Sequence, residues 1–310
     1  MRRALAAGTA TLLAILALTP AIATAADSRA AIDTPLFDYA ISLPPFLPPF
    51  NDSTHKQIAT FEAEMSRHPP PEDSECAQTL GATRFARQYD DLGSAQSNAG
   101  DYAAAIAAYE KALACTPRDA SIHAELASEF LHVGHLTNAR GAAERGVVID
   151  GDNSSLDSVL MQLDFIDEHW ADTVARLRAM IAVQPDDERA TYFQCFLWLA
   201  QRRAGVREPE LVKRTEYEEW PAAVLEALRG TETEAEVLKE IRQQPNEIRR
   251  REMLAEALFY VGQLRLANGE PETARRYFAA AVNLKVLYFI EHHLARAEIR
   301  KMKQQTAQAD

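Results

Sequence analysis

The sequence predicts an all-α fold, a solenoid of stacked helix-turn-helix pairs, and three observations support this prediction. Ala and Leu dominate the composition and only 12 of the 310 residues are Gly, which favours helices. Small and large residues recur with a period of 34 residues through the middle of the chain. No strand-like alternation of useful length interrupts that period. Each helix pair is therefore expected to bury its apolar face on the next pair.

The period is clearest in the window that begins at Ala86. Small residues stand where two helix backbones must approach, and large residues fill the space between them. The residues at these positions are Leu92-Gly93, Gly100-Asp101-Tyr102, Ala105, Tyr109, Ala112 and the terminating Pro117. This pattern is that of tetratricopeptide repeats (TPRs), so we expect a TPR array over residues 76–205.

Further windows keep the same spacing. They begin at Ala120, Ser154 and about Glu188, and the pattern is lost between Arg203 and Pro209. It returns from Ala255, after a helical segment expected over residues 218–242. A last helix is expected from Leu287 to Lys303. We therefore predict a C-terminal helical and TPR-like region over 206–303 and a disordered tail over 304–310.

The N-terminus has the three parts of a secretory signal peptide, predicted over residues 1–25. Arg2-Arg3 is the basic part, residues 4–19 are uncharged and mostly apolar, and Ala23-Thr24-Ala25 suits a signal peptidase. An uncleaved membrane anchor is the alternative, but the many Ala and Thr residues argue against it. Cleavage would remove two positive charges and change the net charge from -12 to -14. No Cys near the cleavage site could accept a lipid, so we expect no stable membrane anchor after cleavage.

Residues 26–75 form a Pro-rich extension ahead of the array. The run Leu43–Phe50 holds four Pro residues and should be extended, because Pro cannot continue a helix. It is either a linker or an apolar arm that packs on a neighbouring subunit or on the chain's own solenoid. Ser53 is a candidate N-cap for a short helix that ends near His68, before Pro69.

Charge and motifs exclude several function classes. The net charge of -12 disfavours broad binding to nucleic acid. Ser53-Thr-His-Lys56 has the S-x-x-K spacing of penicillin-binding enzymes but lacks their S-D-N and K-T-G elements. His132 and His135 have no convincing further ligands for a metal ion. Glu291-His292 is either a hydrogen-bonded pair of functional importance or a packing and capping element. We predict a non-catalytic protein with no metal and no cofactor.

The chain has three Cys residues, so it can form at most one internal disulfide. Cys195 lies in a strongly apolar stretch and is expected to be buried. Export would place the chain in an oxidising compartment. Cys76 and Cys115 are therefore the candidate disulfide pair.

The region from Trp220 to Glu298 carries a more specific pattern. It comprises Trp220, Val224, Leu228 and Gly230, the run from Glu256 through Phe259-Tyr260 to Gly262, then Gly269, Ala274, Phe278, Ala281-Val282 and Phe289-Ile-Glu291-His292. This pattern resembles the C-terminal half of the NlpI family of periplasmic lipoproteins.

The resemblance implies a helical homodimer that acts as a periplasmic adaptor, docking a tail-specific protease and bringing it murein hydrolases in cell-wall maintenance. This chain departs from the family in having no lipid-accepting Cys. It is therefore expected to be soluble in the periplasm, or membrane-associated only through partners. The other hypothesis, from the same repeats and the apolar arm, is a structural or assembly subunit of an outer-membrane or secretion complex.

The repeat register also predicts a concave groove that binds protein segments. Its lining is small and polar without a cluster of Lys and Arg, which favours recognition of an extended or helical segment by shape and hydrogen bonds. Alternatively, the Pro-rich arm or a dimer partner fills the groove. The predicted lining residues are Arg87, Asp90, Ser94, Ser97 and Asn98, then Ser121, Ala124, Ser128, Leu131 and His132, then Ser158, Gln162 and Phe165.

Overall fold

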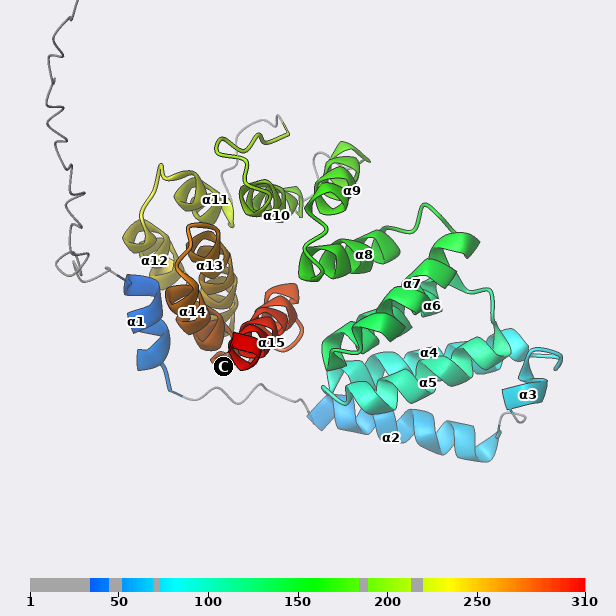
Figure 1. The fold of residues 1–310 in the computed structure, drawn as a ribbon. Helices are drawn as coiled ribbons and strands as arrows, with labels where there is room; N and C mark the ends of the chain where they lie inside the picture. The colour runs from blue at the N-terminus through cyan, green and yellow to red at the C-terminus, as the bar shows by residue number, and fades with distance from the viewer. Residues whose placement is uncertain (1–33, 45–51, 70–72, 184–188, 213–219, 310) are drawn as a thin grey trace, which may run out of the picture. The chain divides into compact units, whose positions relative to one another are not determined.

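The computed structural model describes residues 34–44, 52–69, 73–183, 189–212 and 220–309 (Figure 1). Every regular element in these ranges is an α-helix, which confirms the predicted all-α class. The predicted signal peptide and most of the Pro-rich run lie outside the described residues. Within the described ranges, no helix combines the length and apolar character that crossing a membrane requires.

Three consecutive helix pairs form the TPR array, in which the two helices of each pair pack on one another and successive pairs are in contact. The turn within each of the first two pairs has a Gly in the left-handed region, Gly100 (φ 78°) and Gly134 (φ 84°), where other residues are strained. The pairs are α4 (Ala82–Asn98) with α5 (Tyr102–Cys115), α6 (Ala120–Val133) with α7 (Leu136–Ile149), and α8 (Ser154–Ile166) with α9 (Trp170–Val183).

One contact of the repeat recurs at two distant places in the chain. A Cβ on Gly93 would lie 2.9 Å from the ring of Tyr109, which packs on it from the second helix of the pair. A Cβ on Gly262 would lie 2.7 Å from the ring of Phe278 in the same way. The late pair is α13 (Glu247–Ala267) with α14 (Pro271–Asn283). The predicted return of the TPR pattern after Ala255 is thus present as the same glycine–aromatic packing.

The fourth repeat is incomplete. Helix α10 (Ala190–Arg203) is followed by irregular chain through Val212 rather than by a second helix. Two buried glutamines hold that chain with paired hydrogen bonds. Gln201 donates to the Glu210 carbonyl (2.7 Å) and accepts from its N–H, and Gln194 does the same with Val212. These amides satisfy backbone groups that a second helix would have paired.

The helical segment expected over 218–242 comprises two helices, α11 (Ala222–Arg229) and α12 (Glu234–Gln243). Gly230 (φ 81°) ends the first in a left-handed cap, and Thr233 opens the second in a capping box with Glu236. The last helix, α15 (Ile290–Ala309), runs past Lys303, so the tail predicted to be disordered is helical as far as Ala309. Residues 304–309 contain no Gly or Pro, and their Gln and Ala favour helix.

The N-terminal extension contains the helix that was expected to end near His68 and two shorter helices that the sequence analysis did not place. Helix α2 starts at Asp52 and ends at Arg67, so Ser53 lies in its first turn and not at the predicted N-cap position. It packs on α4. Helix α1 (Pro35–Ser42) packs on α12, α13 and α14, some 200 residues later in the chain (Figure 1). Phe37 lies against Tyr277 there, with ring centroids 6.1 Å apart, beneath the guanidinium of Arg276.

The short helix α3 (Asp73–Cys76) is tied to the end of α5. Cys76 and Cys115 form a disulfide, with their Cα atoms 4.6 Å apart, and both are buried. Cys195 is a free thiol in the core, where burial raises its pKa. The disulfide fixes the segment ahead of the first repeat onto that repeat.

Candidate binding surface: the groove and the pocket beside the last helix

The predicted groove is accessible at its first helix pair. Arg87 and Asn98 on α4 are exposed, and Asp90, Ser94 and Ser97 are half-buried. Partial burial, followed by the charges of Asp91 and Asp119, raises the pKa of Asp90.

Two of these serines make contacts between helices. The Ser94 hydroxyl lies 3.2 Å from that of Tyr109, within its own repeat. The Ser97 hydroxyl donates to Glu129 of α6 at 2.7 Å and so joins the first two repeats. These contacts hold the Ser94 and Ser97 side chains in place while leaving both partly exposed.

At the next two pairs, Leu131, Gln162 and Phe165 are buried and so are not available to a partner. The Gln162 amide donates to the Ser158 carbonyl of its own helix. Phe165 packs edge-on against Phe196 with ring centroids 5.6 Å apart. Of the other predicted lining residues, Ala124 is buried, Ser121 is exposed, and Ser128, His132 and Ser158 are half-buried.

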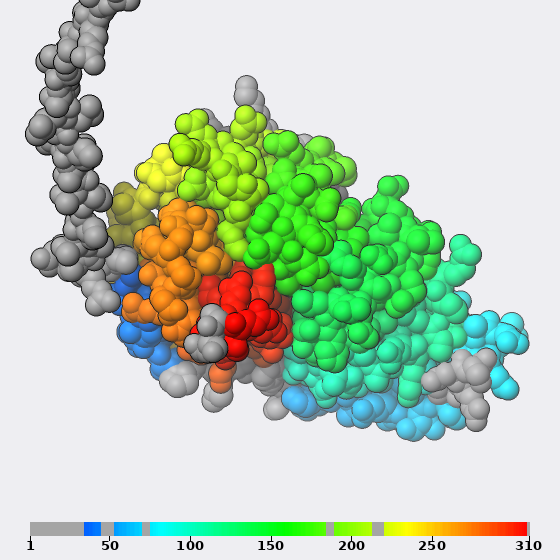
Figure 2. Space-filling view, viewed as in Figure 1, coloured from blue at the N-terminus to red at the C-terminus, as the bar shows by residue number. Residues whose placement is uncertain are grey.

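The last helix, α15, covers this part of the groove. Figure 2 shows its surface between those of α14 and of the middle helix pairs. The imidazole of His293 stacks on that of His132 with centroids 4.1 Å apart. Lys301 donates to the Ile166 carbonyl at the end of α8 (2.6 Å) and pairs with Glu168. The occupant is therefore the chain's own C-terminal helix, an alternative that the sequence analysis did not consider.

Three histidines meet at this contact. Burial, followed by Arg296 and His132, lowers the pKa of His292 to about 4. Burial also lowers the pKa of His293 well below its usual value. The two α15 rings are thus neutral at pH 7 and pack as aromatic groups. In the part of the chain that the structure describes, no group of three or more His, Cys, Asp or Glu side chains is arranged to hold a metal ion.

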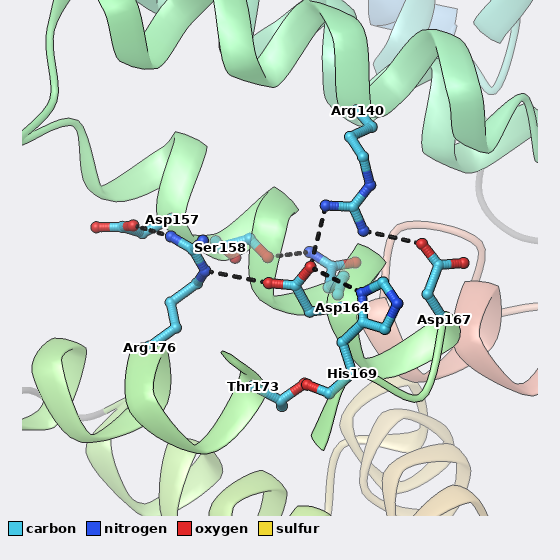
Figure 3. Close-up of polar contacts among 9 residues, drawn as sticks. Arg140, Asp157, Ser158, Asp164, Asp167, His169, Thr173 and Arg176 are labelled. Carbon is cyan, nitrogen blue, oxygen red and sulfur yellow. Dashed lines mark hydrogen bonds and ion pairs between the residues drawn. The ribbon is translucent and has the colours of Figure 1, made fainter. Parts of the chain in front are cut away.

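A buried carboxylate fixes α8 between its neighbours (Figure 3). Asp164 accepts from Arg140 of α7 at 3.0 Å and faces Arg176 of α9 at 3.5 Å. Arg140 also binds Asp167 and Arg176 also binds Asp157. Each guanidinium group thus contacts Asp164 and one further carboxylate. Asp164 therefore joins α7, α8 and α9 in one network of ion pairs and holds α8 in position. Sequence reasoning missed this residue, although a carboxylate inside the apolar run from Met161 to Ile166 was a signal for it.

A pocket of about 290 Å³ opens in the groove at the start of α15. Met161, Phe196, Glu256 and Glu291 are its buried residues, and Arg189 and Tyr288 are its exposed ones. Ser158, a predicted groove position, lines it as well, which places the pocket on the predicted face. The remaining lining residues are Tyr192, Phe193, Arg249, Phe289 and Ile290.

Two acids at this pocket are almost fully buried. Glu256 accepts a short hydrogen bond from the Trp220 indole and lies 3.6 Å from Arg249. Burial, followed by the charge of Glu291, raises the pKa of Glu256 to about 8. Glu291 accepts from the Tyr260 hydroxyl at 2.7 Å, and burial raises its pKa too.

The sequence analysis left Glu291-His292 as either a hydrogen-bonded pair or a packing and capping element. The hydrogen-bond partner of Glu291 is Tyr260, and the ring of His292 packs edge-on against His293, so the paired alternative is wrong. Glu256 lay within the run quoted for the NlpI resemblance without a role of its own. No local pattern marked it as the neighbour of Glu291, because the two acids stand 35 positions apart in the sequence.

Three solved structures are similar to the chain. A tetratricopeptide repeat protein from Parabacteroides merdae aligns with 86% of this chain and 100% of its own at 13% identity and a TM-score of 0.48. The MamA protein aligns over 66% of this chain and 93% of its own, at 17% identity and TM-score 0.38. YrrB, described as a TPR protein with an unusual peptide-binding site, aligns with 77% of this chain and 99% of its own. The sequence identity is 14% and the TM-score is 0.39.

No family model matches the sequence, and no curated protein matches it. The assignment of the TPR fold therefore stands on the helix pairs and glycine–aromatic contacts of this chain itself.

Proposed function

We propose that the protein is a non-catalytic adaptor that binds segments of other proteins in the open parts of the groove, at α4 and at the pocket beside Ser158 of α8. The observation that carries this proposal is that the groove remains open on both sides of α15. On one side lie the exposed polar residues of α4, and on the other lies the pocket beside Ser158. Open polar and aromatic surface between rigid helices suits recognition of an extended or helical segment.

The cellular role that we propose is periplasmic. The signal pattern over residues 1–25 and the NlpI-like pattern from Trp220 to Glu298 support it. In this role the protein, acting as a homodimer, recruits a tail-specific protease to murein hydrolases during cell-wall maintenance. In this proposal any association with the membrane runs through its partners.

The test is affinity capture from a periplasmic extract of the source cells, using the full chain with a C-terminal tag and identifying the bound proteins by mass spectrometry. Capture of a tail-specific protease together with a murein hydrolase supports the adaptor role. Capture of outer-membrane or secretion components alone, with loss of that complex on deletion of the gene, would establish the assembly-subunit alternative instead.

Two charge reversals show whether the groove is responsible. Asp90→Lys changes the open part of the groove on α4, and Glu144→Lys makes the same change at an exposed position on α7, the second helix of its pair. We expect the first variant to lose the captured partner and the second to keep it. Equal capture by both variants would contradict binding in the groove.

A further inference from the structure

The pocket at the start of α15 is lined mostly by aromatic and aliphatic side chains. We propose that it holds one uncharged aromatic side chain, Phe or Tyr, of a partner protein bound in the groove. The inference rests on the proposed adaptor function, because it takes the ligand to be part of a bound protein. It adds the chemical class of the residue that anchors that partner.

The apolar lining comes largely from two segments of the chain. Tyr192 and Phe193 lie on α10, Phe289 and Ile290 lie where the chain enters α15, and all four are half-buried. Phe196, one turn further along α10, is buried. A partner side chain in the pocket would remove the exposed parts of these residues from water, which is favourable in proportion to the apolar area buried. Well-packed pockets of this kind are where aromatic anchors contribute most at protein interfaces.

The size and chemistry of the pocket favour a ring. Its volume is about 290 Å³, whereas an apolar cavity of about 150 Å³ in another protein already binds benzene. Met161, which is fully buried in the lining, offers a thioether, and sulfur contacts the edges of aromatic rings favourably. Packing of a ring against the phenylalanines of the lining adds stabilisation beyond the area buried. An aromatic side chain therefore suits this lining better than an aliphatic one of equal area.

The two acids of the pocket do not call for a counter-ion. Burial, followed by the charge of Glu291, raises the pKa of Glu256 to about 8, so this carboxyl is mostly protonated at pH 7. Burial raises the pKa of Glu291 as well. The Trp220 indole and the Tyr260 hydroxyl, both neutral, donate hydrogen bonds to Glu256 and Glu291 respectively. A cation placed here would have to displace a proton before it gained an ion pair.

The two arginines of the pocket are engaged within the chain. Arg249 pairs with Glu252 at 3.1 Å and donates to the Tyr192 hydroxyl at 3.2 Å. Arg189 interacts with other residues of the chain, and its guanidinium lies 6.0 Å from the centre of the Phe193 ring. An anion would have to break these contacts and also lose its water, which is costly. The charge distribution therefore favours an uncharged ligand.

The test uses the full chain labelled with ¹³C at its methionine methyl groups. Met161 lies in the lining, so its methyl signal, assigned with Met161→Leu, reports occupancy. Four probes are titrated at pH 7: p-cresol, which is the side chain of Tyr, n-hexanol, which is similarly hydrophobic, benzylammonium and benzoate. We expect p-cresol to give a saturable shift with an affinity at least about tenfold above that of either ion, since each ion would lose its water without a free counter-ion. It should also bind more tightly than n-hexanol.

Two variants locate the binding. Ser158 of α8 lines the pocket, so Ser158→Phe supplies a ring of the chain's own at this position. Ser155→Phe adds the same ring at an exposed position one turn earlier on the same helix. We expect the first variant to lose the shift with p-cresol and the second to keep it. If Ser158→Phe does not fold, the four titrations of the unaltered chain still decide the question.

Binding of benzylammonium, benzoate or n-hexanol as tightly as p-cresol would overturn the proposal, and so would the absence of a saturable shift with p-cresol. Equal binding of p-cresol by the two serine variants would place its site elsewhere and overturn the proposal too. The titrations involve no partner protein, so their failure is distinct from a failure of the adaptor role, which the affinity capture tests.

Discussion

His132, at the end of α6, and His293, in the first turns of α15, stack with their ring planes 26° apart and their centroids 4.1 Å apart. Tyr102 closes the cluster with its ring 4.9 Å from that of His132. The contact joins the second repeat to the end of the chain across about 160 residues. The contact holds α15 over α6, where Leu131 is buried, whereas Arg87 and Asn98 of α4 remain exposed.

Acid should weaken this contact. The pKa of His292 beside the stack is lowered to about 4, whereas a histidine of the unfolded chain titrates near 6.5. The unfolded chain thus binds the proton more tightly, so stability is complete above about pH 6.5 and falls as the pH drops toward 4. His292 should account for about 3 kcal/mol of unfolding free energy in this loss, measured as the change in urea unfolding between pH 7 and pH 4 in the unaltered chain compared with His292→Phe.

The charged and titratable neighbours of this cluster are Glu129 of α6 and Arg296 of α15, with Tyr102. We expect His292→Phe to reduce the acid-induced loss, whereas His135→Gln, at an exposed histidine, should leave it unchanged. An identical pH dependence in all three proteins would contradict the assignment.

The glycine–aromatic contact should tolerate no added methyl group. Gly93→Ala and Gly262→Ala place a Cβ 2.9 and 2.7 Å from an aromatic ring, so each should lower the unfolding free energy by about 1–3 kcal/mol. Gly141→Ala is the matched control, since its Cβ would meet only the flexible end of Arg145 at 3.6 Å. It should raise the unfolding free energy by about 0.5–1 kcal/mol, because Ala favours a helix interior. Equilibrium denaturation compares the three, and equal effects would count against the packing described.

Asp164 should be a stability residue. Asp164→Ala leaves Arg140 and Arg176 without their shared buried partner and should cost about 3 kcal/mol, as breaking a buried ion pair commonly does. Glu144→Ala on exposed α7 surface should change stability by less than about 0.5 kcal/mol. Thermal and urea unfolding check both variants, and a neutral Asp164→Ala would show that the network in Figure 3 contributes little.

The disulfide predicts one free thiol per chain. Alkylation of the unfolded, unreduced protein should modify Cys195 alone, and mass spectrometry counts the added groups. Reduction should lower the unfolding free energy by about 4 kcal/mol, the effect expected for a closed loop of 39 residues. Cys115→Ser should lower stability to the same extent and make it insensitive to reductant. Three alkylated thiols in the protein isolated from its own compartment would contradict the pairing.

The sequence was sufficient to predict the local architecture. The spacing from Ala86 to Pro117 predicted the first pair, and the return of the pattern near Ala255 predicted the pair α13–α14. Both predictions were possible because the two helices of a repeat contact one another through residues within the same 34-residue period. The sequence also predicted a helical segment over 218–242 but not its division at Gly230, where a left-handed cap ends α11.

The arrangement of distant segments could not be predicted in this way. Helix α1 on α14, α15 over α6 and α8, and Glu256 beside Glu291 all depend on contacts between residues far apart in the chain. A single sequence carries no local signature of such contacts. The predicted groove residues on α4 are accessible, whereas Leu131, Gln162 and Phe165 are buried because helices from elsewhere in the chain cover them.

The most direct test of the central claim is hydrogen–deuterium exchange of the full chain with and without a captured partner. Binding in the groove predicts new protection in α4, in the part of α8 around Ser158 and in α10, with the second helices α5 and α7 unchanged. Protection confined to α5, α7 and α9, with α4 and the pocket helices unaffected, would contradict the claim that this protein holds its partners in the groove.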